Sequence, residues 1–334
     1  MFTKYLTRRD LIKFGSFSLL SLLSSCGSAE KKIKIILENS FYPKAFQDAI
    51  PNSWQIENIN IEDFQRKKKF REISDTELTL VNDGWLNKVD FNDFIEFNNF
   101  LFEKLDKRAI DFLKNFEENQ KNKLFPIGVV PYAIIIKNNR DLINSARRSW
   151  DFLLSEKLFK KIIFPQSPRL IISIAKRIKT MQSLAKLKNQ AKLFDDRNTL
   201  NWLINSDACV AIVPYSNCSK YLKIDSRLSI VFPKQGVPLI WYFALSRSNP
   251  SNEILLNLIK LLKSQSTVDK LSGEGWYLPI SNDYSQSKYK IKNSQTSQFS
   301  GPSKECWTNS WSLPPLTSSQ KLNLENYWNQ SSTP

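Results

Sequence analysis

Short apolar runs alternate with amphipathic stretches along most of this chain. Residues 32–38 and 54–60 are rich in β-branched and apolar side chains and predict two strands. Between them, Pro43 to Ile50 predicts a helix that begins on its proline. Further elements are predicted in chain order as a charged helix over residues 61–73, a strand over 77–81, a turn over 82–85 and a helix over 102–119. Such alternation is typical of βαβ units in a mostly parallel sheet.

The same pattern then starts again with a strand over residues 129–137, which contains Pro131. It continues with a helix over 149–156, a strand over 161–164, helices between 168 and 205, a strand over 208–213, a turn over 214–216 and a strand over 228–232. The apolar strand over residues 239–246 would lead back to the first half, where a helix over 253–265 would pack. Two crossings between two α/β lobes imply a hinge.

We therefore expect two lobes followed by a C-terminal segment of different character. The expected boundaries are residues 26–130 for the first part of lobe 1, 131–240 for lobe 2, 241–282 for the return to lobe 1 and 283–334 for an irregular C-terminal segment. Residues 281–319 are rich in Ser, Gln, Asn and Lys and show little periodicity. Residues 321–330 predict a short terminal helix.

The first 26 residues have the features of an export signal. Residues 7–13, TRRDLIK, place Arg8 and Arg9 before a short apolar stretch that ends at Leu23, too brief for a permanent membrane span. This run resembles twin-arginine signals, and residues 23–26, LSSC, resemble a lipobox whose cysteine, Cys26, becomes acylated. We expect a signal peptide over residues 1–25 and a periplasmic protein anchored to a membrane by lipid. An ordinary signal peptide with an incidental cysteine is the alternative.

Composition narrows the function classes. The formal net charge is +16, and removal of residues 1–25, which carry four bases and one acid, leaves +13. Such an excess favours anionic partners or reflects compositional drift in an AT-rich genome, and the export signal argues against nucleic acid. The chain has no histidine, which removes the usual general base and the usual zinc ligand. No metal or cofactor is expected, and a disulfide between Cys209 and Cys218 stays open.

Three local motifs carry a family resemblance. Residues 79–86, TLVNDGWL, are similar to a Leu-Gly-Asp-Gly-Trp-Leu stretch, and residues 232–236, FPKQG, followed by 240–245, IWYFAL, are similar to a Pro-Lys-Glu-Gly stretch and a Trp-bearing strand. Over residues 32–282 the chain resembles the spermidine/putrescine-binding family of type II periplasmic solute-binding proteins. The resemblance implies a two-lobed type II fold and a monomer without enzymatic activity. It also implies that the chain passes a small molecule to an ABC permease and its ATPase.

Ligands of open α/β sheets bind beyond the carboxyl ends of strands, which in a two-lobed protein face the region between the lobes. The candidate ligand-binding residues are Asp83, Trp85, Tyr132, Ser167, Arg169, Tyr215 and Trp241. The tryptophans would offer aromatic faces, and the helix opened by Ser167 could bind an anion through its amides. As alternatives, the two tryptophans fill the core, Asp83 only caps the following helix, and Arg169 pairs with a surface acid.

Two departures from the family pattern weigh against a polyamine ligand. Phe243 stands where the family has a carboxylate, and Pro168 with Arg169 stands where polyamine binders carry acids. Without these carboxylates, the ammonium groups of a polyamine would be poorly compensated on desolvation. Ferric-ion binding uses adjacent tyrosines, and the sequence has no Tyr-Tyr pair. The remaining alternative is a structural or assembly lipoprotein whose cleft no longer binds a solute.

Overall fold

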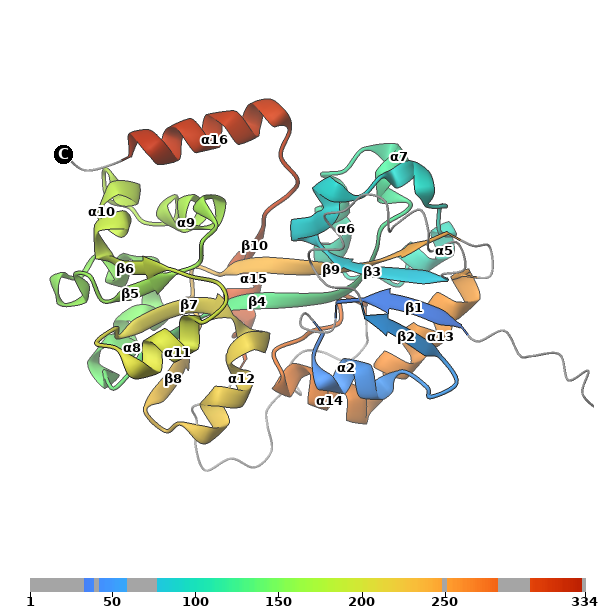
Figure 1. Cartoon of the computed structure of the whole chain (residues 1–334), viewed down its shortest axis with the longest axis horizontal. Helices are drawn as coiled ribbons and strands as arrows, with labels where there is room; N and C mark the ends of the chain where they lie inside the picture. The colour runs from blue at the N-terminus through green and yellow to red at the C-terminus, as the bar shows by residue number, and fades with distance from the viewer. Residues whose placement is uncertain (1–32, 39–41, 59–76, 248–250, 282–300, 332–334) are drawn as a thin grey trace, which may run out of the picture.

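The computed structural model describes residues 33–38, 42–58, 77–247, 251–281 and 301–331. Figure 1 shows two lobes side by side, with two long strands running between them through the middle of the molecule. One mixed sheet extends through both lobes in the order β2-β1-β3-β9-β4-β7-β5-β6, with β10 beside β9 and β8 beside β4. The chain therefore has an α/β fold with two lobes and strands that cross between them, as the sequence predicted.

The first lobe is built on three parallel strands, β1, β2 and β3, and on β9, which is antiparallel to β3. These strands are β1 (Lys34–Leu37), β2 (Gln55–Asn58), β3 (Leu78–Asn82) and β9 (Pro238–Ser246). Its helices are α2 (Lys44–Ala49), η2 (Asp83–Lys88), η3 (Phe91–Asp93), α5 (Asn99–Phe102), α6 (Lys107–Leu113), α7 (Glu118–Lys121), α13 (Ser251–Leu262) and α14 (Gln265–Gly273). Strands β1 and β3 are almost entirely buried, which explains why apolar residues follow one another in them without polar alternation over most of their length.

The second lobe repeats this plan. Its strands are β5 (Ile162–Phe164), β6 (Ala191–Phe194), β7 (Val210–Pro214) and β8 (Leu228–Val231), and β5 is parallel to both β6 and β7. Its helices are α8 (Arg140–Arg148), η4 (Trp150–Leu154), η5 (Glu156–Leu158), α9 (Pro168–Ala175), α10 (Ser183–Gln190), α11 (Thr199–Asn205) and α12 (Tyr215–Ile224). Tyr215, expected in a turn, is the first residue of α12.

Strand β4 (Phe125–Lys137) crosses from one lobe to the other. Its residues up to Pro131 pair with β9, and those from Tyr132 onward pair with β7 and β8. All of these pairings are antiparallel, so the sheet is mixed rather than mostly parallel as predicted. The strand also begins earlier than predicted. Pro126 has no N–H group to donate to the ladder, and a register shift between Pro126 and Gly128 lets the strand continue past it.

The single helix predicted over residues 102–119 is wrong. The structure has three short helices there, α5, α6 and α7. Asp106 separates the first two, because its side chain accepts a hydrogen bond from the Ala109 amide and starts a new helix. The helix predicted over residues 61–73 lies outside the described residues, as do the signal peptide and Cys26. Among the described residues, no helix is long and apolar enough to cross a membrane.

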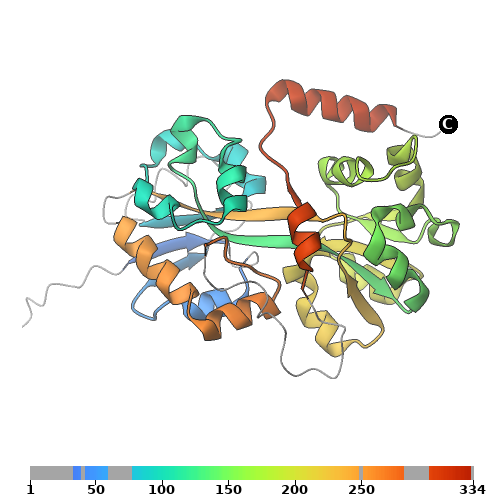
Figure 2. The same ribbon diagram turned by 180° about the vertical axis from the view of Figure 1, so that it is seen from behind.

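The C-terminal segment, residues 301–331, is ordered as helix, strand and helix. It contains α15 (Lys304–Asn309), β10 (Trp311–Ser312) and α16 (Ser318–Gln330). Seen from behind, α15 lies over β4 and β9, and α16 lies beside α9 and α10 of lobe 2 (Figure 2). Strand β10 pairs with the beginning of β9. The terminal helix predicted over residues 321–330 is confirmed as α16. The polar composition of residues 281–319 predicted an irregular chain, but within 301–319 a few aromatic side chains anchor an ordered segment to both lobes.

Candidate functional site

Asp83 lies at the point where β3 ends between the two lobes. Strand β3 pairs with β9 up to Asn82, which lies opposite Tyr242. The chain then turns into η2, and the side chain of Asn82 accepts a hydrogen bond from the Gly84 amide. The Asp83 carboxylate accepts the next amide along β9, that of Trp241. The side chain of Asp83 thus accepts a hydrogen bond from β9 at the point where the backbone of β3 no longer pairs with that strand.

Burial gives this carboxyl group an unusual protonation equilibrium. Desolvation raises the pKa of Asp83 to about 7, although the amide of Trp241 and the positive charge of Arg169 both favour the ionised form. The free-energy cost of removing the charge from water exceeds the stabilisation of the ionised form by these partners. Near pH 7, the ionised form of Asp83, which only accepts hydrogen bonds, and the protonated form, which can also donate one, are therefore both populated. Such a group can bind a polar group of either kind.

Side chains from both lobes surround Asp83. Arg169, at the start of α9 in lobe 2, interacts electrostatically with Asp83, and burial lowers the pKa of its guanidinium. Burial also raises the pKa values of Tyr132 on β4 and Tyr242 on β9, and the negative charge of Asp83 raises both further. The charge of Asp196, in the loop after β6, acts on Tyr132 as well. The interlobe site thus combines one cation, two carboxyl groups and two neutral phenols.

Arg169 has a second partner from the C-terminal segment. Its guanidinium donates a hydrogen bond to the carbonyl oxygen of Pro314, so this segment borders the interlobe site. Ser167 precedes the same helix, and its hydroxyl oxygen accepts a hydrogen bond from the Leu170 amide nitrogen, 3.4 Å away. Ser167 therefore serves here as the N-cap of α9. The anion site expected from the amides of this helix stays a prediction.

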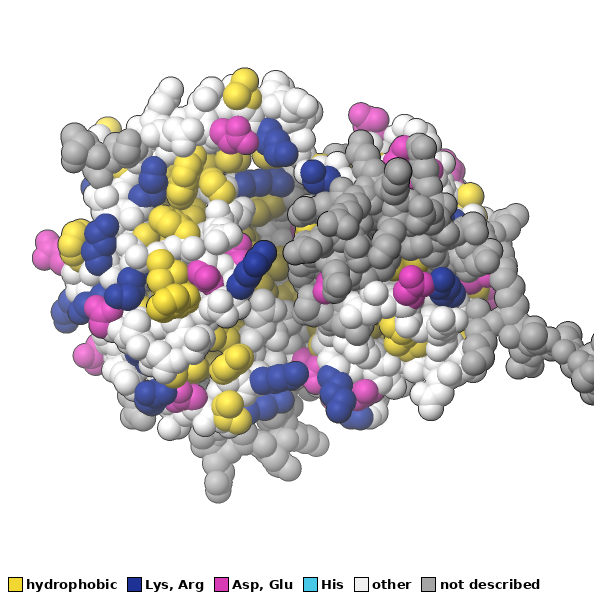
Figure 3. Space-filling view, viewed as in Figure 1, with side chains coloured by type: hydrophobic (Ala, Val, Ile, Leu, Met, Phe, Trp, Pro, Cys, Tyr) yellow, Lys and Arg dark blue, Asp and Glu magenta, His cyan; other side chains and the backbone are white. Residues whose placement is uncertain are grey.

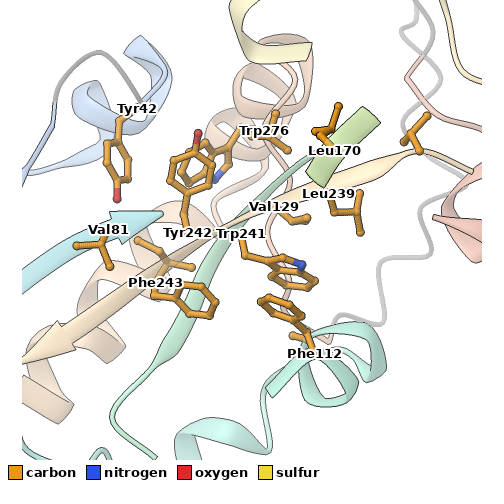
Figure 4. Close-up of a cluster of buried hydrophobic side chains, with 14 of the residues drawn as sticks. Tyr42, Val81, Phe112, Val129, Leu170, Leu239, Trp241, Tyr242, Phe243 and Trp276 are labelled. Atoms are coloured by element: carbon orange, nitrogen blue, oxygen red, sulfur yellow. The ribbon is translucent and has the colours of Figure 1, made fainter. Parts of the chain in front are cut away.

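Trp241 packs in the core. Its side chain is 0% exposed and stacks on Phe112, with ring centroids 4.9 Å apart. Its indole Nε1 donates to Ser312 Oγ at 2.7 Å. Figure 4 shows Trp241 and Phe112 on one side of β9 and Tyr242 on the other. The indole thus contributes to packing in this structure and offers no exposed face to a solute.

The other tryptophan and the second-lobe tyrosine are also held by packing. Trp85, in η2, is half-buried against the main core. Tyr215 is buried and packs edge-on against Phe232. It also lies against Gly275, where a Cβ atom would come within 2.7 Å of the Tyr215 ring. The structure therefore groups Asp83, Tyr132 and Arg169, while it places Trp241 and Tyr215 in the core.

An aromatic cluster beside this group was not predicted from the sequence. Tyr42, Tyr242 and Trp276 come from three distant parts of the chain, and their ring centroids lie 4.1 to 5.4 Å apart. Gly128 lies opposite Tyr242 on β4, and a Cβ atom there would come within 2.0 Å of the Trp276 ring. Alternation along β4 places Tyr132 on the same face. Tyr42 lies between the carboxyl end of β1 and the start of α2. Because ligands of α/β sheets bind beyond the carboxyl ends of strands, this position in the sequence could have identified Tyr42 as a candidate.

Two polar atoms of this cluster have no partner. The hydroxyl of Tyr42 and the indole Nε1 of Trp276 are buried and make no hydrogen bond to the part of the chain that the structure describes. A buried unsatisfied donor costs about 1 to 3 kcal/mol. Both rings pack against Tyr242, which interacts electrostatically with Asp83 and Tyr132, so this part of the interlobe site is a candidate for binding a hydrogen-bond acceptor.

Among the described residues, the structure shows no cluster of metal ligands and no disulfide. Within the described ranges, no three side chains of His, Cys, Asp or Glu come together in a way that could hold a metal ion. Cys209, Cys218 and Cys306 are free thiols, so the possible disulfide between Cys209 and Cys218 is absent. The Cys218 thiol instead lies 3.2 Å from the carbonyl of Tyr215 within α12.

Comparison with known proteins identifies the fold. No protein-family model and no curated protein sequence matches the chain. Among solved structures, the spermidine/putrescine ABC transporter substrate-binding protein PotD from Streptococcus pneumoniae superposes with a TM-score of 0.69 at 12% identity, covering 90% of this chain and 98% of that chain.

Two further solved structures are similar at lower scores. The ferric-binding protein from Campylobacter jejuni has a TM-score of 0.56 at 13% identity, covering 90% of this chain and 99% of its own. The Tp0655 lipoprotein of Treponema pallidum has a TM-score of 0.55 at 12% identity, with coverages of 90% and 99%. At these identities the similarity establishes the fold alone, and the fold of this chain is that of two-lobed ABC-transporter substrate-binding proteins.

Proposed function

We propose that this chain is the solute-binding component of an ABC importer, which captures a small organic molecule between its lobes and delivers it to a permease and its ATPase. The observation that carries the proposal is the apposition of Asp83 from lobe 1 and Arg169 from lobe 2. Buried ionisable groups from two lobes are costly unless a partner compensates them. A solute held between the lobes would supply such a partner.

The same proposal includes export and anchoring. The twin-arginine motif at Arg8 and Arg9 and the lipobox at Cys26 support a periplasmic lipoprotein. A lipid anchor would keep the binding protein close to the membrane in which the permease lies. Transport through the twin-arginine pathway is compatible with lobes that fold before export.

The side chains of the site favour a solute with hydrogen-bond acceptors over a polyamine. Arg169 is a cation, the phenols of Tyr132 and Tyr242 stay neutral and can donate, and Tyr42 has an unpartnered hydroxyl. Phe243 is fully buried, with its ring 6.0 Å from that of Phe112 and 6.1 Å from that of Phe116. We therefore rank small organic anions and zwitterions ahead of polyamines as ligands.

One observation favours a second candidate function. Arg169 already donates to the chain's own Pro314 carbonyl, so part of the interlobe site has an internal partner. A structural or assembly lipoprotein that no longer binds a solute would show such a contact. In that case the lobes would have a fixed arrangement, and no small molecule would stabilise it.

A thermal-shift screen distinguishes the two functions. Polyamines, amino acids and small organic acids are added singly to the purified protein. A ligand present at 100 times its dissociation constant should stabilise the protein by about 2.7 kcal/mol. An Arg169→Gln variant should lose the shift, whereas Lys104→Gln, an exposed lysine of lobe 1, should keep it. The absence of a shift with every class of solute would favour the structural lipoprotein.

A further inference from the structure

The positive charge of this protein is concentrated in one lobe. Residues 131–240 contain 19 lysines and arginines and only 7 acids, whereas residues 26–130 contain 16 bases and 18 acids. Compositional drift toward lysine would affect both regions, and the numbers of bases are indeed similar. The asymmetry arises because residues 131–240 contain far fewer acidic residues than residues 26–130. Drift alone does not explain that difference.

One end of lobe 2, which we call the distal end, lies opposite the interlobe site. It is formed where β4 ends and where β5, β6 and β7 begin. Backbone hydrogen bonds connect it: the Cys209 amide donates to the Lys161 carbonyl, the Lys137 amide to the Cys209 carbonyl, and the Asn138 amide to the Arg227 carbonyl, at 2.8 to 3.0 Å. The loops that carry Lys161, Lys137 and Arg227 therefore form one continuous surface.

Basic side chains dominate this distal end. Lys157, Lys160 and Lys223 are exposed. The other cations near it are Lys137, Lys161, Lys192, Lys220 and Arg227, and the acids are Asp141, Glu156, Asp207 and Asp225. Two of these acids are already neutralised by ion pairs, Asp207 with Lys192 and Asp225 with Arg227. The charge presented to a partner is therefore positive.

Exposed apolar side chains lie among these cations. Phe159 is 58% exposed, between Leu158 and Lys160, and Ile224 is 81% exposed, directly after Lys223. The Lys160 ammonium lies 5.9 Å from the centroid of the Phe159 ring. In lobe 1 no large apolar side chain among the described residues exceeds 41% exposure. Figure 3 shows basic and apolar side chains interspersed over the visible face of lobe 2.

We infer that the distal end of lobe 2 binds an anionic phospholipid surface. Lysines near such a surface are attracted to its negative potential, and single apolar side chains beside them can enter the headgroup region. Separate protruding side chains suit a fluid bilayer better than a fixed protein surface, which buries a contiguous apolar centre. Strand β1, which follows the anchor segment, lies in the other lobe (Figure 1), so a tethered protein would lie along the membrane.

Vesicle co-sedimentation tests this inference on the mature chain with Cys26→Ser, which carries no acyl group. Residues 1–25, removed in this form, contribute no described element. Vesicles of phosphatidylcholine alone are compared with vesicles that contain about one third phosphatidylglycerol. We expect binding only to the anionic vesicles and a strong decrease between low and high salt, because salt screens the attraction.

Two variants with the same change in net charge localise the surface. Replacement of Lys157, Lys160 and Lys223 by Gln should weaken binding about 100-fold, at about fivefold for each lysine. The control replaces Lys44, Lys88 and Lys104 of lobe 1, all exposed, and should weaken binding less than threefold. Equal losses in the two variants, or equal binding to both kinds of vesicle, would overturn the inference. Absence of binding to either vesicle would overturn it as well.

Discussion

Asp83→Asn should change how the stability of this protein depends on pH. The native pKa of Asp83 is raised to about 7 because the carboxyl group is buried, whereas an unfolded aspartate has a pKa of about 3.9. Between these two values the folded protein holds a proton that the unfolded chain has released. Unfolding then releases a proton, so the wild-type stability falls as pH rises from about 4 to about 7 and levels off above that.

The magnitude follows from the difference between the two pKa values. About three pKa units at about 1.36 kcal/mol each set an upper limit of about 4 kcal/mol. Asp83 keeps partial contact with solvent, and water screens part of this penalty. We therefore expect the wild type to lose about 1 to 2 kcal/mol between pH 5 and pH 8 through this group. The asparagine oxygen can still accept the Trp241 amide, so the variant should fold.

Urea denaturation followed by tryptophan fluorescence measures this effect at pH 5, 6, 7 and 8. The difference in unfolding free energy between Asp83→Asn and the wild type should grow in favour of the variant as pH rises. Asp48→Asn, a substitution of an exposed carboxylate on α2, serves as the control and should run parallel to the wild type. Parallel profiles for Asp83→Asn and the wild type would refute the assignment of a desolvated carboxyl group to this position.

Three other substitutions test contacts around the site. Ser312→Ala should cost about 2 kcal/mol of unfolding free energy, because it leaves the buried Trp241 indole without its acceptor; an unchanged urea midpoint would contradict this. Gly128→Ala should cost about 3 kcal/mol, since the new Cβ would overlap the Trp276 ring, whereas Gly273→Ala, which has open space, should be neutral or stabilising in the same melting experiment. Arg169→Gln should raise the pKa of Asp83 further, because the guanidinium charge lowers that pKa. The pH range over which stability falls should then extend to higher pH; an unchanged range would show that the two groups do not interact.

The sequence predicted best those elements whose burial is complete. Strands β1, β3 and β9 are rich in apolar residues, and their predicted ends agree with the structure to within two residues. Asp83 could be singled out because it follows a buried strand, where ligand-binding loops of α/β sheets lie. The burial of this carboxyl group could not be predicted from the sequence, because it depends on contacts with β9 and α9, which are distant in the chain.

Features that depend on distant contacts could not be predicted. Tyr42 and Trp276 lie at opposite ends of the chain, and only the folded sheet brings them against Tyr242. Residues 281–319 were predicted to be irregular because their composition is polar, and only the terminal helix over residues 321–330 was predicted. Its order comes from sparse aromatic contacts, such as Trp307 packing edge-on against Tyr277, and these leave no periodic pattern in the sequence.

Solute titration tests the central claim most directly. The strongest ligand from the thermal-shift screen is titrated by calorimetry into the wild type, Asp83→Asn, Arg169→Gln and the control Lys104→Gln. If a solute binds between the lobes, both site variants should weaken binding at least tenfold, which corresponds to about 1.4 kcal/mol, and the control should bind like the wild type. Equal affinity in all four proteins would contradict a binding site formed by Asp83 and Arg169.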